Sequence, residues 1–484
     1  MTAIVDFLNT VLWGYVLVYG LLAVGLYFTW RTGFLQFRHF AEFFRVVRSS
    51  RDTSAAGISP FQALTISLAS RVGTGNLAGV AVAIYLGGPG AVFWMWVVAL
   101  VGMATAYAES TLAQLYKVRN ADGQYRGGPA FYMSRGIGSN AMGYVFSVCL
   151  IISFGLIFSA VQANSISVAM EEAFAIPKLV TGLVVGGFAG IVIFGGIKSI
   201  ARVAEKIVPA MAGLYIVVAL LVVVLNIADV PAMLALIVKS AFGFEAAAGG
   251  FTGGFMVALL NGVKRGLFSN EAGMGSAPNI AAVAVPDPHH PSSQGLVQGL
   301  GVFIDTLVIC TATALMILLS GVVDYSEGAA TGMALTQIAL EQHIGAFGPI
   351  FIGIAILFFA FTSIIGNYSY AENAMEFLGM GKRIPLLVLK ALVIAMVVWG
   401  SLQAVTTVFN FADASMALMA TVNLIAILIL SKTVAKLTRD YFAQRKAGKE
   451  PMFRIAEYAE LGDGVDHTIW NSNVARETEG AKPD

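Results

Sequence analysis

Eleven long apolar runs constrain this chain more than any other feature of its sequence. A helix needs about 20 mostly apolar residues to cross the hydrocarbon core of a bilayer, and helices can satisfy their own backbone hydrogen bonds there. The sequence therefore predicts an all-α polytopic membrane protein with about eleven transmembrane helices. Numbered in chain order, the spans lie near residues 10–30, 58–87, 90–116, 142–171, 178–196, 205–227, 250–284, 295–321, 347–379, 385–405 and 407–432.

The composition excludes a water-soluble fold. Of the 484 residues, 57% are hydrophobic and 12% are charged, whereas about a quarter of a soluble domain is charged. Cys149 and Cys310 both lie inside apolar runs, so neither a disulfide framework nor a zinc-ligand spacing is present. The chain start lacks the basic segment and cleavage site of a signal peptide. We therefore expect the run from Leu12 to Trp30 to persist as a helix.

The distribution of Lys and Arg predicts the orientation, because basic loops are retained on the cytoplasmic side of a membrane. One side would hold 23 of the 29 basic residues, nine of them in the tail from Lys432 onward. We expect the N-terminus outside and the C-terminus inside, most simply in a prokaryotic cytoplasmic membrane. The polar tail predicts a surface helix followed by a disordered end. The predicted cytoplasmic segments are residues 31–51, 117–135, 198–206, 382–383 and the tail.

An internal repeat is visible in two glycine-rich interruptions of the apolar pattern. Arg71–Gly79 and Arg265–Gly273 share Arg, Asn, Ala and Gly at the same four of nine positions. They are five spans apart, an odd number, so the two copies must insert in opposite senses. This predicts a 5+5 inverted repeat with broken first helices, preceded by one extra helix. The predicted units are residues 1–57, an N-terminal helix and linker; 58–228 and 229–435, the two repeats; and 436–484, the polar tail.

Broken helices at membrane depth carry a chemical requirement. Unwound backbone cannot be left bare in lipid, so it must face protein, water or a ligand. Gly73, Gly75, Gly273 and Gly275 would allow positive φ angles and close approach of a ligand to the main chain. Half-helix N-termini favour a carboxylate, and freed carbonyls can bind a cation. Either segment alone could equally be a helix-packing motif, but the matched pair favours a site for a zwitterion and a cation.

At these residues the sequence resembles the alanine or glycine:cation symporter family, also called the sodium/alanine symporters. The motifs that carry the resemblance are Ser70-Arg-Val-Gly-Thr-Gly-Asn-Leu-Ala-Gly-Val-Ala81 and Phe268-Ser-Asn-Glu-Ala-Gly-Met-Gly-Ser-Ala-Pro278, and the resemblance covers the chain up to the tail. A looser similarity extends to the bacterial leucine transporter architecture. The resemblance implies sodium-driven uptake of alanine or glycine, no cofactor apart from sodium as a co-substrate, lipid contact and no nucleic acid. It leaves the oligomeric state open.

The resemblance also implies a substrate site. The backbone of residues 73–75 would hold the carboxylate, carbonyls of residues 268–271 would take the ammonium, and Met274 and Phe268 would limit side-chain size, favouring alanine or glycine over leucine. The alternative is a purely structural role for each candidate. The hydroxyls would then bond to their own helices, the apolar residues would serve in packing, and the amides, Asn164 among them, would join helices. The candidates are Gly73, Thr74, Gly75, Asn76, Gln162, Phe268, Ser269, Asn270, Glu271, Gly273, Met274 and Asn367.

Thr362 and Ser363 are the candidate cation ligands, because two adjacent hydroxyls offer hard oxygens in a segment otherwise made of Phe, Ala and Ile. By resemblance to the leucine transporter architecture, the carbonyls of Ala69, Val72 and Phe359 would complete a sodium site. The alternative is that both hydroxyls serve only in helix capping or hydrogen bonds between helices.

Ionisable residues at membrane depth are costly and suggest function. Glu271, inside the second break, could bind a proton, sense the ammonium or hold the structure. A proton-coupled amino-acid permease is therefore the rival interpretation, through Glu271, Asp305 or Asp413. An inverted repeat within one chain disfavours a channel, and the sequence carries no catalytic motif of an intramembrane enzyme. The ionisable set is Arg71, Glu109, Lys264, Arg265, Glu271, Asp305 and Asp413.

Overall fold

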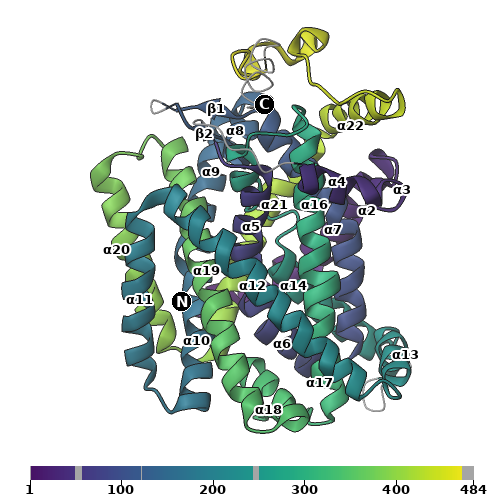
Figure 1. Ribbon diagram of the computed structural model, residues 1–484, viewed down its shortest axis with the longest axis vertical. Coiled ribbons are helices and arrows are strands. Elements are labelled where there is room, and N and C mark those ends of the chain that lie inside the picture. The colour runs from purple at the N-terminus through teal and green to yellow at the C-terminus, as the bar shows by residue number, and fades with distance from the viewer. Residues whose placement is uncertain (1, 50–56, 121–122, 244–249, 471–484) are drawn as a thin grey trace, which may run out of the picture.

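Bundled helices make up nearly all of the chain that the computed structural model describes, which is residues 2–49, 57–120, 123–243 and 250–470 (Figure 1). Within these residues, eight helical runs are long and apolar enough to cross a membrane. This confirms the predicted all-α polytopic membrane fold. The runs are Ala3–Arg31, Gly90–Leu115, Asn140–Phe174, Ser199–Leu225, Pro291–Ser320, Phe347–Phe377, Arg383–Ser401 and Val405–Ile429.

Several of these runs contain π-helical turns, which add a residue to one helical turn and re-aim the side chains that follow. The elements that build the eight runs are α1 (Thr2–Val11), η1 (Leu12–Leu17), α2 (Val18–Arg31), α7 (Gly90–Leu115), α9 (Asn140–Leu150), η4 (Ile151–Phe158), α10 (Ser159–Phe174), α12 (Gly196–Leu225), α16 (Pro291–Val302), η5 (Phe303–Cys310), α17 (Thr311–Ser320), α19 (Phe347–Phe377), α20 (Arg383–Ser401) and α21 (Val405–Ile429).

The three remaining predicted spans are shorter or interrupted. The fifth is α11 (Lys178–Phe194), and the second and seventh are the broken helices at the centre of the bundle (Figure 1). Nearly every residue from Pro60 to Ile84 is buried, whereas α12 exposes much of its apolar surface, as a lipid-facing helix does. The broken helices are α5 (Pro60–Arg71), η2 (Gly75–Gly79) and α6 (Val80–Gly87), and then α14 (Gly250–Asn270) and α15 (Pro278–Val283).

Short helices and one hairpin occupy segments that the sequence analysis left as loops. The acidic loop after the eighth span contains α18, whose Met333, Leu335 and Leu340 are buried. Such helices are too short to cross a bilayer, so hydropathy alone does not reveal them. They are α3 (Leu35–Arg38), α4 (Phe40–Ser49), β1 (Val118–Arg119) paired with β2 (Tyr125–Arg126), α8 (Pro129–Phe131), η3 (Tyr132–Gly136), α13 (Val230–Ala241) and α18 (Gly332–Ile344).

The C-terminal tail begins with the expected surface helix, α22 (Ser431–Lys446), and continues through η6 (Ile455–Glu457) and η7 (Ala459–Gly464). The prediction of a disordered end is wrong for residues 451–470. Trp470 is 1% exposed and its Nε1 donates to the Leu115 carbonyl at 3.2 Å. Residues 471–484 lie outside the described part of the chain. We call the end of the bundle that carries α4, α22 and the β1–β2 hairpin, at the top of Figure 1, the tail face.

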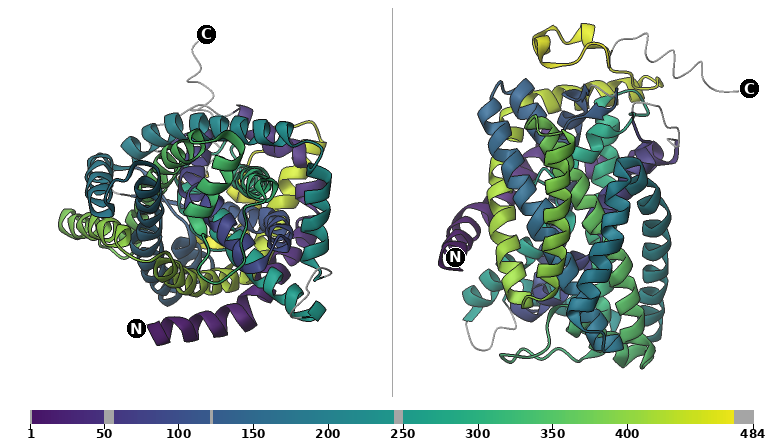
Figure 2. Two further views of the ribbon diagram at one scale, coloured as in Figure 1. Left: turned by 90° about the horizontal axis from the view of Figure 1, so that it is seen from below. Right: turned by 90° about the vertical axis from the view of Figure 1, so that its left-hand side faces the viewer.

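The tail face joins the outer ends of both broken helices. Ile58, just before α5, donates to the carbonyl of Val283, the last residue of α15, at 3.3 Å and accepts from the amide of Val285 at 2.9 Å. Lys117 then donates from Nζ to the Ala284 carbonyl at 2.9 Å, and the same ammonium lies over the Trp470 ring. In Figure 2 the tail covers this end of the bundle, while α1 lies along its outside. The described part of the tail, up to Trp470, therefore belongs to the folded body.

The packing of Trp470 predicts a local effect of its removal. Truncating a buried Trp to Ala costs about 3–5 kcal/mol, and here the loss falls on a terminal segment. We expect Trp470→Ala to release residues 451–470, so that trypsin cleaves faster after Arg454, whose side chain is already exposed but whose backbone belongs to the folded segment, with the thermal unfolding of the bundle nearly unchanged. His467→Ala, at an exposed position of the same segment, is the control. Unchanged protection of Arg454 in Trp470→Ala would contradict the packing.

Candidate functional site

The two broken helices meet at the centre of the bundle. The first break begins where α5 ends at Arg71, because Val72 turns to extended backbone with ψ of 97°. The second begins where α14 ends at Asn270, and Glu271 follows with φ of 58°. A positive φ is unfavourable for a residue with a side chain and persists only where the surroundings enforce it. Both interruptions lie where the sequence predicted them.

The glycines of the two breaks have different roles. Gly273 and Gly275 have φ of 93° and 82°, as predicted. Gly73 and Gly75 do not use the positive φ that glycine allows. They allow close approach instead. A Cβ on Gly73 would lie 2.5 Å from Ser363 Oγ and 2.7 Å from Gln162 Oε1, and one on Gly75 would lie 3.0 Å from the Cα of Ser269.

The freed backbone of the first break is held by amide side chains. The Gly73 amide donates to Asn76 Oδ1, and the Thr74 amide donates to Gln162 Oε1, both at 3.0 Å. The Thr74 hydroxyl is buried and has no hydrogen-bond partner among the described residues. The structure thus brings Gly73, Thr74, Asn76 and Gln162 together, and it leaves one hydroxyl there for a ligand.

Oxygen atoms converge beside this break. Ser363 Oγ lies 2.8 Å from the Ala69 carbonyl oxygen, 3.0 Å from that of Phe359 and 3.5 Å from that of Val72. Thr362 Oγ1 lies 2.9 Å from the same Phe359 oxygen. One hydroxyl has one proton and can donate to only one acceptor at a time. Hard oxygens gathered in this way suit a small cation that takes oxygen ligands.

A second polar cluster joins both breaks to η5. Asp305 Oδ1 accepts from Asn76 Nδ2, and Oδ2 accepts from Ser269 Oγ, each at 2.6 Å. The Thr306 hydroxyl donates to Oδ2 at 2.7 Å, and Cys310 lies 3.1 Å from Ser269 Oγ. The sequence flagged Asp305 as an ionisable residue at membrane depth but did not place it, Thr306 or Cys310 at the site. The signal available in the sequence was the single charge of Asp305 within an apolar run.

Glu271 holds the two breaks together from the other side. Its Oε1 accepts from Ser70 Oγ at 3.1 Å and its Oε2 from Ser276 Oγ at 2.5 Å. Ser70 Oγ also lies 2.6 Å from Asn367 Oδ1, so Asn367 reaches the site through Ser70. The Asn367 amide nitrogen is buried without a partner among the described residues. The contacts of Glu271 match the structural role that the sequence left open.

Asn270, Gly273 and Met274 belong to the far side of the second break. Asn270 Oδ1 accepts from the Ala272 amide at 3.0 Å, and Gly273 donates to Glu109 Oε1 at 3.2 Å. Met274 is fully buried in the turn that follows Glu271. None of these contacts reaches Gly73–Asn76. Asn164, another amide considered from the sequence, bonds to the carbonyls of Gly400 and Gln403 and joins α10 to the end of α20.

An aromatic cluster lies beside the first break, with the Phe268 ring next to Gly75. Phe268 stacks on Phe158 with ring centroids 4.8 Å apart and lies 5.4 Å from Phe409. Three residues before Phe268 in α14, Arg265 Nη2 pairs with Asp413 Oδ2 at 2.5 Å. The Arg265 guanidinium lies 5.0 Å from the Phe409 ring. The sequence found Phe268 but gave no signal for Phe158 or Phe409, since three Phe among 32 are not distinctive.

Two broken helices that meet inside a membrane bundle, with polar groups turned toward each other, define a membrane transporter and not an enzyme. The profile of the sodium:alanine symporter family matches residues 1–455. The chain belongs to this family.

Known relatives agree with this assignment. The chain is 50% identical over 451 residues to the probable sodium/glutamine symporter GlnT of Bacillus subtilis (strain 168), covering 93% of this chain and 92% of GlnT. It is 40% identical to a sodium/proton-dependent alanine carrier protein of Bacillus sp. (strain PS3), covering 84% and 93%. A crystal structure of an Eremococcus coleocola manganese transporter mutant shares the fold, with a TM-score of 0.52 and 12% identity, over 78% and 83% of the two chains.

The crowding at Gly73 predicts the effect of a single methyl group. In Gly73→Ala the new Cβ would displace Ser363 or Gln162, and small displacements in a binding site are costly. We expect amino-acid transport to fall by about tenfold or more. Gly79→Ala is the matched control, because its Cβ would meet nothing closer than 3.6 Å. Equal transport by the two variants, at equal amounts in the membrane, would show that Gly73 is not at the site.

Proposed function

We propose that this protein is a secondary symporter that couples sodium entry to uptake of a small neutral amino acid, alanine or glycine, by alternating access. The observation that carries the proposal is the convergence of Ser363 Oγ on the carbonyl oxygens of Ala69, Phe359 and Val72. This cluster joins the end of α5 to α19. Thr362 adds a further hydroxyl to the same group. A sodium ion bound among these oxygens would fix the broken helix against α19.

The proposed coupling follows from one shared piece of backbone. Val72 contributes a carbonyl to the oxygen cluster. The next two residues, Gly73 and Thr74, contribute the amides that donate to Asn76 and Gln162. A cation that orders Val72 therefore also orders the backbone proposed to receive the substrate carboxylate. Because coupling is a difference in affinity, each ligand should raise the affinity for the other by the same factor.

The proposed preference for a small substrate rests on crowding. A Cβ added at Gly73 would collide with Gln162 and Ser363, and one at Gly75 would crowd the Phe268 ring. Phe268 is in turn fixed between two other rings. The relatives bear names that include alanine and glutamine, so substrate size is the point to test. In this proposal the Thr74 hydroxyl and the carbonyls of residues 268–271 bind the polar end of the amino acid.

Proton coupling is the second candidate, and Asp305 favours it. This carboxylate is fully buried, accepts hydrogen bonds from Asn76, Ser269 and Thr306, and touches both breaks. An acid in this position could carry a proton in place of a metal ion. The name of one relative includes both sodium and proton. Measuring uptake driven by a sodium gradient at fixed pH distinguishes sodium coupling from proton coupling.

We also propose that the tail face is cytoplasmic and the N-terminus is outside, in the cytoplasmic membrane of a prokaryote. The described cations Arg38, Arg45, Arg439, Arg445 and Lys446 all lie at this face. The rule that basic loops are retained in the cytoplasm supports this orientation.

The first experiment is uptake of radiolabelled amino acids into proteoliposomes under an imposed sodium gradient, an imposed proton gradient, or neither. We expect accumulation of alanine or glycine that requires sodium at fixed pH, with glutamine transported less well. Accumulation driven only by protons would transfer the coupling role to Asp305. Accumulation of glutamine in preference to alanine and glycine would show that the proposed size limit is wrong.

A single hydroxyl tests the cation ligands. Hydrogen bonds and similar contacts to charged groups are worth about 1.5–3 kcal/mol, so we expect Ser363→Ala to raise the half-saturating sodium concentration by about tenfold or more. The amino-acid affinity at saturating sodium should change less. Ser369→Ala, which removes a hydroxyl bonded only to Gly366 of the same helix, is the control. Unaltered sodium affinity in Ser363→Ala would exclude this serine as a ligand.

A further inference from the structure

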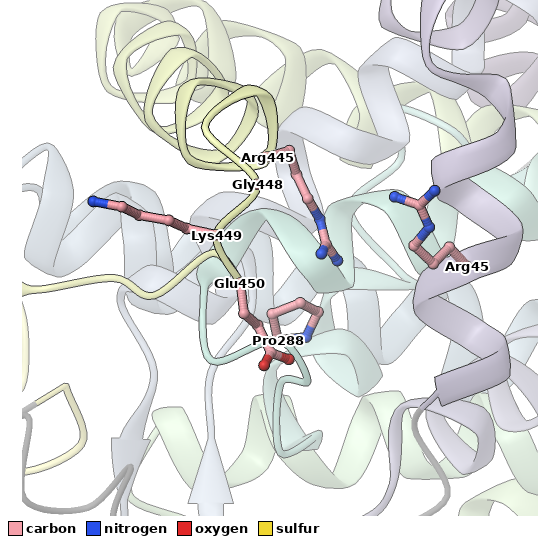
Figure 3. A pocket seen from close by; sticks show the side chains of 6 residues that line it. All are labelled: Arg45, Pro288, Arg445, Gly448, Lys449 and Glu450. Carbon is pink, nitrogen blue, oxygen red and sulfur yellow. The ribbon is translucent and has the colours of Figure 1, made fainter.

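A basic groove lies on the tail face between α4 and the C-terminal half of α22. Its volume is about 660 Å³. A neighbouring pocket of about 480 Å³ shares Arg45 and Arg445 with it. Figure 3 shows these two side chains reaching toward one another from α4 and from the end of α22, while Lys449 points away. The groove is lined by the cations Arg38, Arg45, Arg439, Arg445 and Lys446, and by His39 and Glu42.

The groove carries an excess of positive charge. Five Lys or Arg side chains line it, and Glu42 is its one acidic side chain among the described residues. Glu42 is already engaged. Its Oε2 pairs with Arg45 Nη1 at 2.8 Å, and its Oε1 pairs with Arg445 Nε at 2.7 Å and accepts from the Tyr441 hydroxyl at 2.9 Å. Glu42 therefore orients two arginines and leaves the charge of the groove strongly positive. Planar guanidinium groups suit the oxygens of a phosphate.

Aromatic side chains place the groove at a membrane boundary. The membrane-crossing helix α2 ends at Arg31, and α3 and α4 follow directly. Phe37 on α3 and Phe44 on α4 are 59% and 46% exposed, and each directly precedes an arginine of the groove, Arg38 or Arg45. The opposite face of α4 buries Phe43 and Val46 against the bundle. A helix that exposes aromatic and basic residues together belongs in the interface between lipid and water.

We propose that the groove between α4 and α22 binds the phosphate headgroup of an anionic phospholipid. The phosphate lies between Arg45 and Arg445, and Arg38, Arg439 and Lys446 add positive charge around it. The acyl chains leave the groove past Phe37 and Phe44. Basic pockets beside membrane helices are suited to acidic headgroups, and the exposed phenylalanines favour a lipid over a free anion. This site is separate from the broken helices and does not depend on the proposed transport function.

Native mass spectrometry of the detergent-purified full chain tests the proposal. The probes are phosphatidylglycerol, phosphatidylcholine and inorganic phosphate at equal concentration. We expect wild-type protein to retain phosphatidylglycerol in preference to phosphatidylcholine. The groove variant Arg38→Gln/Arg439→Gln/Lys446→Gln should lose about tenfold or more of this retention. The control Arg119→Gln/Lys382→Gln/Arg383→Gln removes three exposed tail-face charges outside the groove and should lose less than about twofold.

Each other outcome overturns the proposal. Equal loss in the groove and control variants would show only general attraction to surface charge. Full retention by the groove variant would exclude the groove. Inorganic phosphate that displaces phosphatidylglycerol at equal concentration would show a site for a free anion. Lys446→Gln alone, at the exposed end of α22, gives a second measurement if the triple variant does not fold, with an expected loss of about threefold; unchanged retention there would also count against the groove.

Discussion

Unwound backbone in the middle of a membrane must be hydrogen-bonded to something, and the rest of this structure depends on that requirement. Two polar side chains serve the first break, since Asn76 accepts from Gly73 and Gln162 accepts from Thr74. More serve the second, Glu109 and Asn423 among them. Glu109 accepts from the Gly273 amide, and Asn423 donates to the Gly273 carbonyl at 2.9 Å and to Glu109 at 2.8 Å. The costly polar residues of the bundle are thus placed where helices cannot satisfy themselves.

This requirement divides the buried polar residues into two groups. Glu109, Glu271 and Asn423 bond to backbone or serine groups of the breaks and hold their shape. Thr74 and Ser363 differ, because the first has an unused hydroxyl and the second has more acceptors around it than one proton can serve. The first group makes a rigid frame, and the second group holds the polar atoms to which the proposed function assigns the ligands. A charge at membrane depth is therefore not by itself a sign of ligand contact.

The sequence predicted most of the fold, because hydropathy and charge report directly on which segments cross a membrane. The two breaks were predictable for the same reason, as glycine and polar residues are conspicuous inside apolar runs. Contacts between distant spans were harder to predict. Ser363 was found through its hydroxyl, but the three-ring cluster of Phe158, Phe268 and Phe409 was not. A phenylalanine at a site and one facing lipid look alike in a sequence, and only the arrangement of helices separates them.

The same limit applied to the tail. Its charge predicted a disordered end, yet Phe453, Ile469 and Trp470 are each at most 1% exposed. A few apolar residues in a polar segment were enough to anchor it, and hydropathy averages conceal such residues. Lys117 was likewise used only to predict which side of the membrane its loop lies on. In the structure it donates to the Ala284 carbonyl beneath Trp470.

The position of Trp470 has a consequence for how the protein is made. Ribosomes deliver a chain from its N-terminus, so every span enters the membrane before residues 451–470 leave the exit tunnel. The ring that packs over Lys117, beside the strand-like pairing of Ile58 with Ala284, is therefore among the last parts to arrive. This end of the bundle can therefore be completed only after every span has been made, and the newly inserted helices must remain together in the bilayer until then.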